Sequence, residues 1–115
     1  MTAQALPKEI LDELRAEYLA AMPDIIKNIE EMYEQKNWSA LEKVFHKLTG
    51  SGKTYGLPDI TDIARAIETY FQKYNPPSED LIGESIQVFK EIISAYIIQS
   101  TIDSKKKDSH IRKIS

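Results

Sequence analysis

Apolar residues recur at intervals of three and four along most of the chain, and this spacing constrains the fold more than any other feature. Such intervals place the apolar side chains on one face of an α-helix. The first stripe, over residues 7–35, contains Leu11, Leu14, Tyr18, Met22, Ile25, Ile29 and Met32. Pro23 lies inside this stripe. Because proline lacks the donor N–H, we expect the helix to break near Met22.

Local signals predict three further helices. Ser39 begins a capping-box pattern, which predicts a helix from Ser39 to about Tyr55. Gly56 is a C-terminal stop signal, and Pro58 is suited to the first turn of the next helix. That helix should end in an Asn-Pro-Pro run, after which Ser78 caps another. Their stripes are Ile60, Ile63, Ala64, Ile67, Phe71 and Tyr74, and then Ile82, Phe89, Ile93 and Tyr96.

The predicted helices indicate an all-α fold. We expect an antiparallel four-helix bundle with an additional short N-terminal helix. A chain of 115 residues has the size of one domain, which we expect to span residues 1–102. The sequence contains no cysteine, which excludes disulfides and thiolate zinc sites. No window approaches the ~20 apolar residues that a membrane span needs. We therefore expect a cytoplasmic protein that does not bind membranes and is a monomer by default.

Charge is distributed unevenly along the chain. The formal net charge is -3, but residues 105–115 carry about +4 and the rest is correspondingly acidic. The basic residues there are Lys105, Lys106, Lys107, Arg112 and Lys113. An acidic body argues against nucleic acid as a partner, because binding to phosphates needs positive charge clustered on a folded face. We expect residues 103–115 to form a basic, flexible tail, in which His110 has no assigned role.

One histidine stands out on the helix predicted over residues 39–55. On a helical wheel at ~100° per residue, the apolar stripe lies opposite His46, which therefore points into solvent. The stripe consists of Leu41, Val44, Leu48 and Tyr55. The outer face around the histidine carries Glu42, Lys43, Thr49, Gly50 and Lys53. A glycine inside a helix costs roughly 1 kcal/mol relative to alanine, so Gly50 and Gly52 indicate space for an approaching molecule.

An exposed imidazole suits phosphoryl transfer. A large neutral fraction at pH 7 leaves one ring nitrogen of His46 available as a nucleophile. The transfer demands alignment and charge neutralisation, most of which a partner with its own carboxylate and metal can supply. Lys43 and Lys53 could stabilise the added negative charge. Most lone histidines are ordinary surface residues, however, so these observations alone leave the function open.

The segment from Ala40 to Gly56, ALEKVFHKLTGSGKTYG, resembles the signature of histidine-containing phosphotransfer (HPt) domains. That signature places leucine, lysine, glycine and serine at fixed intervals after the histidine, and ends in a hydrophobic residue and a glycine. The spacing fits without gaps. The agreement continues through Ile60, Ile63, Ala64, Ile67 and Glu68, where the family places the core face of its next bundle helix. The resemblance covers roughly residues 7–100.

The resemblance implies a role in two-component signal transduction. His46 would accept a phosphoryl group from a receiver-domain aspartate, become a phosphohistidine, and pass the group to another receiver. Gly50 would give the receiver steric access, and Ser51 and Gly52 would let the helices pack closely. Such a phosphocarrier has no catalytic activity or cofactor of its own. Its expected partners are the receiver domains of response regulators and hybrid histidine kinases, and Mg²⁺ is expected in the receiver.

The chain departs from the family signature at Thr49, where the family usually has a lysine. The cation that normally supports the phosphoryl group is therefore missing from its usual place. We hypothesise that Lys53 or Lys43 replaces it. Thr49 also leaves open an alternative, a helical interaction module that docks on a receiver or kinase without accepting phosphate.

Two other classes fit the sequence less well, and a metal site is not expected. The run Gly-Ser-Gly-Lys-Thr at residues 50–54 resembles part of a nucleotide-binding P-loop, but Lys47 stands where that motif requires glycine, and no strand precedes it. The dimerisation helices of histidine kinases carry an acid after the histidine, where this chain again has Lys47. A metal site is not expected, because His110 lies far from the residues around His46 in the sequence.

Overall fold

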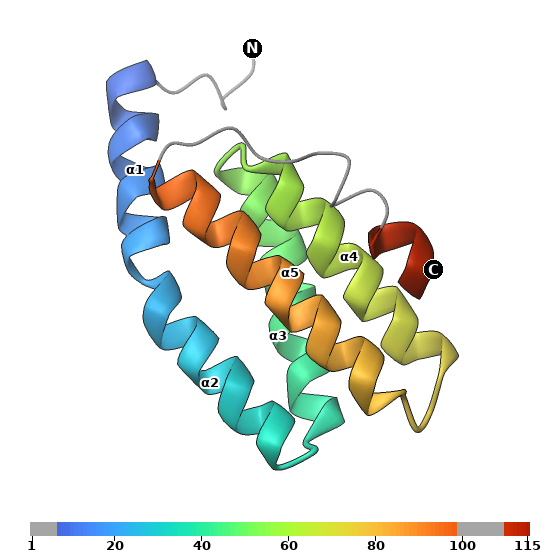
Figure 1. Ribbon diagram of the computed structural model, residues 1–115. Coiled ribbons are helices and arrows are strands. Elements are labelled where there is room, and N and C mark those ends of the chain that lie inside the picture. The colour runs from blue at the N-terminus through green and yellow to red at the C-terminus, as the bar shows by residue number, and fades with distance from the viewer. Residues whose placement is uncertain (1–6, 99–109) are drawn as a thin grey trace.

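The computed structural model describes residues 7–98 and 110–115, and the main part forms a bundle of helices (Figure 1). The long helices are α1 Lys8–Ala20, α2 Met22–Glu34, α3 Trp38–Thr54, α4 Pro58–Lys73 and α5 Glu79–Ile97. No strand occurs in the described residues, so the predicted all-α fold is confirmed. Helices α2 to α5 form the bundle, and α1 continues from α2 past the C-terminal end of α5 (Figure 1).

The first apolar stripe is divided between two helices, as Pro23 predicts. The chain turns at Ala21, and Pro23 occupies the first turn of α2. At that position its missing N–H costs nothing, because the first amides of a helix have no partner within the helix. The break therefore falls next to Met22, where the sequence predicts it.

Helix α1 lies on the outside of the molecule, and none of its residues is fully buried. Two hydrogen bonds connect it to α3 and the turn that follows. The Tyr18 hydroxyl lies 2.6 Å from the Ser51 hydroxyl, and Arg15 Nε donates to the carbonyl of Tyr55 at 2.6 Å. Burial raises the pKa of the Tyr18 phenol. These side chains hold α1 against the same helix that carries His46.

The ends of α3 show one correction and one confirmation. The predicted N-cap at Ser39 was wrong, since Asn37 accepts a hydrogen bond from the Ala40 amide at 3.2 Å and the helix begins at Trp38. At the other end, Gly56 adopts a φ of 68°, the left-handed conformation that lets a chain leave a helix. Ser78 caps α5, as the sequence predicts.

The core lies between α2, α3, α4 and α5. Its largest fully buried side chains are Phe45, Phe89, Met22, Ile29, Leu41, Ile60, Ile63, Ile67, Ile82 and Ile93. Phe45 and Phe89 meet edge to face with ring centroids 5.6 Å apart, which joins α3 to α5. The predicted stripe on α3 omitted Phe45 and included Val44 and Tyr55, which are only half-buried. The buried face is thus rotated toward Phe45, which brings His46 nearer to the α4 side of α3.

The end of the chain differs from the predicted flexible tail. Residues 110–114 form a helical turn beside α4 (Figure 1). His110 and Ile114 in this turn are only 8% and 3% exposed. The remainder of the predicted tail, residues 103–109, lies outside the described residues. Among the described helices, none is long and apolar enough to cross a membrane.

Candidate functional site

His46 projects from α3 and is held at one ring nitrogen. As the helical wheel predicts, 74% of its side chain is exposed. Its Nδ1 atom lies 2.5 Å from Oε2 of Glu68 on α4, a side chain that is only 15% exposed. A carboxylate can only accept a hydrogen bond, so we infer that Nδ1 carries the hydrogen. In the neutral ring the lone pair is then on Nε2, the other nitrogen.

Gly52 and Thr61 mark a close contact between α3 and α4. A Cβ atom on Gly52 would lie 2.6 Å from Thr61 Oγ1 and 2.9 Å from the Thr61 amide nitrogen. At the same contact, the Thr61 hydroxyl on α4 donates a hydrogen bond to the carbonyl of Thr49 on α3 at 3.1 Å. Gly52 is therefore a packing glycine, as the family resemblance implies, and does not leave space beside His46.

Gly50 has the opposite environment. A Cβ atom built on it would meet nothing within 4 Å, and the residue is exposed one turn beyond His46. The prediction that Gly50 leaves room on the histidine face agrees with this geometry.

A shallow hollow surrounds His46. It is lined by Ser39, Glu42, Lys43, His46, Lys47 and Glu68. Two of the predicted site residues, Glu42 and Lys43, therefore lie beside the imidazole. Lys53 is in the last turn of α3 and is not part of this lining. Thr49 is half-buried, and its hydroxyl donates back to the Phe45 carbonyl at 2.9 Å.

An apolar groove adjoins the hollow. It has a volume of about 270 Å³ and lies between α1, α2 and α3. Its lining consists of Tyr18, Ile25, Asn28, Met32, Val44, Lys47, Leu48 and Ser51. Lys47 lines both depressions, so a molecule that covers His46 can also reach the groove.

Glu68 is the site residue that the sequence analysis missed. The family resemblance places Glu68 on the core face of its helix and does not indicate a contact with His46. The sequence does contain one sign of this contact, because Glu68 is an acid at the edge of an apolar stripe. It directly follows Ile67, which is fully buried in the structure. Such an acid is rarely buried without a partner. Among residues 7–98 and 110–115, no group of three or more histidine, aspartate or glutamate side chains could hold a metal ion.

Comparison with known proteins assigns the family. The family model described as Hpt domain matches residues 13–97, a range that includes His46, Glu68 and all of α2 to α5. None of the curated proteins and none of the solved structures that were compared matches the chain. Hpt domains are phosphocarrier modules that work with receiver domains. The match spans most of the sequence and agrees with the helical bundle, so the chain belongs to the Hpt domain family of two-component phosphorelays.

Proposed function

We propose that His46 accepts a phosphoryl group from the aspartyl phosphate of one receiver domain and passes it to the aspartate of another. The observation that carries this proposal is the exposed imidazole held at Nδ1 by Glu68. The Nε2 atom is thereby left as the nucleophile. The family assignment supports the class of reaction, and the geometry supports the choice of residue.

The transfer balances without movement of a proton. The Nε2 lone pair attacks phosphorus in line, and a P–N bond forms while the P–O bond to the aspartate breaks. The bonding electron pair leaves with the aspartate carboxylate. The ring keeps its Nδ1 hydrogen and becomes a positively charged phosphoimidazolium, beside which the Glu68 carboxylate supplies the opposite charge. The reverse sequence delivers the group to the next receiver.

The phosphoryl oxygens also need support. We assign this role to Lys43, because it lines the same hollow as His46. Lys53 follows His46 by seven residues, about 10 Å along the helix axis, and lies outside that hollow. The receiver would supply the aspartate and its Mg²⁺. This chain contributes the nucleophile, its orientation and part of the charge neutralisation.

The docking surface in this proposal extends beyond the outer face of α3, which carries His46, Glu42 and Thr49. A receiver that places its aspartyl phosphate on His46 must cover the hollow. The apolar groove begins at Lys47 on the edge of that hollow, and its α3 wall includes Val44. We infer that an apolar part of the receiver occupies the groove, while Gly50 provides clearance one helical turn beyond the histidine.

A phosphotransfer assay tests the proposal. Receiver domains encoded in the same genome are labelled with radioactive acetyl phosphate and then mixed with the full chain. We expect an acid-labile, alkali-stable label on the wild-type protein and none on His46→Gln. An unlabelled wild-type chain that nevertheless binds the receiver would contradict the proposal and favour the alternative of a module that docks without accepting phosphate.

The role of Glu68 requires a second comparison. Glu68→Gln keeps a hydrogen-bond acceptor for Nδ1 but removes its charge. A bond to a charged group is stronger than a neutral one by about 1 kcal/mol, so we expect transfer to be about fivefold slower. Glu31→Gln, which neutralises an exposed acid on α2, is the matched control. Equal rates for the two variants would show that Glu68 does not act on the ring.

A further inference from the structure

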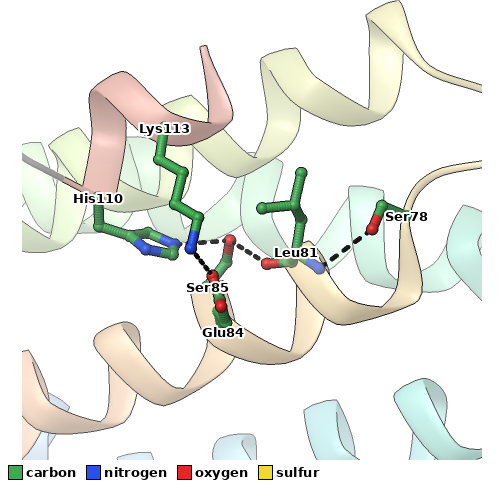
Figure 2. Close-up of polar contacts among 6 residues, drawn as sticks. All are labelled: Ser78, Leu81, Glu84, Ser85, His110 and Lys113. Carbon is green, nitrogen blue, oxygen red and sulfur yellow. Dashed lines mark hydrogen bonds and ion pairs between the residues drawn. The ribbon is translucent and has the colours of Figure 1, made fainter.

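The C-terminal turn is attached to α5 through two side chains (Figure 2). His110 Nε2 lies 2.9 Å from the hydroxyl of Ser85, and Lys113 Nζ lies 2.6 Å from Oε2 of Glu84. Figure 2 shows both side chains directed from the turn toward neighbouring positions on α5. The turn thereby returns to the bundle at a site separate from His46 on α3.

The attachment depends mainly on the buried side chains. His110 and Ile114 are buried and lie one turn apart, on the same face. The pair between Lys113 and Glu84 is about half exposed, and such pairs contribute little to stability. A single helical turn is not stable alone in water. Whether the segment is docked is therefore decided by the burial of His110 and Ile114.

The hydrogen bonds around Ser85 assign the donor. The Ser85 hydroxyl has one hydrogen, which it donates to the Leu81 carbonyl at 2.7 Å. Towards His110 it must then act as an acceptor, so Nε2 of His110 carries a hydrogen. The neutral ring satisfies this arrangement. A second proton would add a positive charge at a buried position, next to a serine that is fully buried.

Burial of the ring, and not the sum of the nearby charges, is what disfavours protonation of His110. The charged groups that act on the ring are Glu84 on α5 and Lys113 on the turn itself, and these two form an ion pair. From α4, Lys73 Nζ donates to the Ser115 carbonyl at the end of the turn, which adds another positive charge to this region. Burial lowers the pKa of His110, Glu84 opposes this effect without cancelling it, and Lys113 adds a smaller lowering. The bond from Lys113 lowers the pKa of the Glu84 carboxyl, so this carboxylate stays ionised in mild acid and does not itself act as the pH-sensitive group.

We propose that residues 110–115 form a proton-sensitive latch, docked on the bundle while His110 is neutral and released when His110 binds a proton. Release uncovers the part of the bundle surface on which Ile114 is buried. The latch does not depend on phosphorylation of His46. It adds a conformational response to pH through residues of the turn and α5 that the phosphotransfer step does not use.

The direction of the pH effect follows from linkage. The pKa of His110 is lower in the docked segment than the ordinary value of about 6.5 that applies after release. Docking is strongest when the pH is above the ordinary pKa of histidine. It weakens as the pH falls below that pKa toward the lower pKa that His110 has in the docked segment. Between the two values, the ratio of docked to released protein falls about tenfold for each pH unit.

Nuclear magnetic resonance of the full chain tests the latch directly. The sequence contains only two histidines, so the imidazole spectrum holds two sets of ring signals, and His46→Gln identifies them. Between pH 8 and pH 5 we expect His110 to titrate below its ordinary value. The amide signals of residues 111–115 should change from docked to free over the same range. His46→Gln should leave this transition unchanged.

Two variants make the test specific to His110. His110→Gln keeps a side-chain N–H that can reach Ser85 but removes the titrating group. The backbone amide signals of residues 111–115 in this variant should therefore not change with pH. Ser85→Ala removes the acceptor, so release should begin at a higher pH than in the wild-type protein. The proposal is overturned if His110 titrates at or above its ordinary value, or if residues 111–115 stay docked after its ring is protonated. Release of His110→Gln along the wild-type curve would overturn it as well.

Discussion

Replacing Gly52 or Gly50 with alanine is expected to change the free energy of unfolding in opposite directions, although the two lie two residues apart on α3. At Gly52 the new Cβ would lie 2.6 Å from Thr61 Oγ1 and 2.9 Å from the Thr61 backbone nitrogen. The hydroxyl could rotate away, but the backbone atom cannot move unless α3 and α4 separate. At Gly50 the new methyl group would meet nothing within 4 Å.

The magnitudes follow from three contributions. Overpacking at Gly52 costs about 1–3 kcal/mol. Loss of the hydrogen bond from Thr61 to the Thr49 carbonyl adds about 1 kcal/mol. The higher helix propensity of alanine offsets about 1 kcal/mol of this. Gly52→Ala should therefore destabilise the fold by about 1–3 kcal/mol, whereas Gly50→Ala, with the propensity contribution alone, should stabilise it by up to about 1 kcal/mol.

Urea unfolding followed by circular dichroism measures both changes, and thermal unfolding provides a second reading. For a domain of this size, 1 kcal/mol corresponds to a change in Tm of about 4–8 °C. A Gly52→Ala protein as stable as the wild type would refute the close contact with Thr61. A Gly50→Ala protein that is less stable than the wild type would refute the open environment of Gly50. Under the proposed function, Gly50→Ala should also accept phosphate more slowly despite its greater stability.

Three further predictions concern α3. Lys43→Gln should slow transfer to His46 about fivefold, because a neutral side chain cannot offset the phosphoryl charge, and a larger effect from Lys53→Gln would contradict this assignment. Val44→Asp places a charge in the apolar groove and should weaken receiver binding about tenfold in titration calorimetry, equivalent to about 1.4 kcal/mol; unchanged affinity would exclude the groove from the interface. Asn37→Ala removes the helix cap and should lower the free energy of unfolding by about 1 kcal/mol, whereas Ser39→Ala should not.

Helix positions were largely predictable because their signals act over a few residues. Pro23, Gly56 and Ser78 each act on the turn in which they occur, and the structure places all three at helix ends. The first residue of α3 was not predictable in this way, because both Asn37 and Ser39 are residue types that cap helices. The sequence alone does not show which of the two follows the turn out of α2.

Docking of the C-terminal turn was not predictable from composition. Basic residues dominate the last part of the sequence and indicate a solvated segment. The two buried side chains, His110 and Ile114, make an apolar face of only one turn, which is too short for periodicity to detect. Their burial depends on a matching surface on α4 and α5, in particular on Ser85, and the sequence of the tail carries no information about that surface.

The contact between His46 and Glu68 depends on a relation between helices that a helical wheel does not contain. A wheel gives the face of each helix but not the offset of one helix along another. The close approach of Gly52 to Thr61 supplies that offset. His46 lies six residues before Gly52, about 9 Å along α3, and Glu68 lies seven residues after Thr61, about 10.5 Å along α4.

Because α3 and α4 are antiparallel neighbours, these two steps run in the same direction and bring Glu68 level with the imidazole (Figure 1). A methyl group at Gly52 should therefore disturb the histidine as well as the core. We expect the ring nitrogens of His46 in Gly52→Ala to lose the chemical-shift pattern of a single tautomer, while Gly50→Ala retains it. An unchanged pattern in Gly52→Ala would show that Glu68 finds the histidine without the help of this close contact.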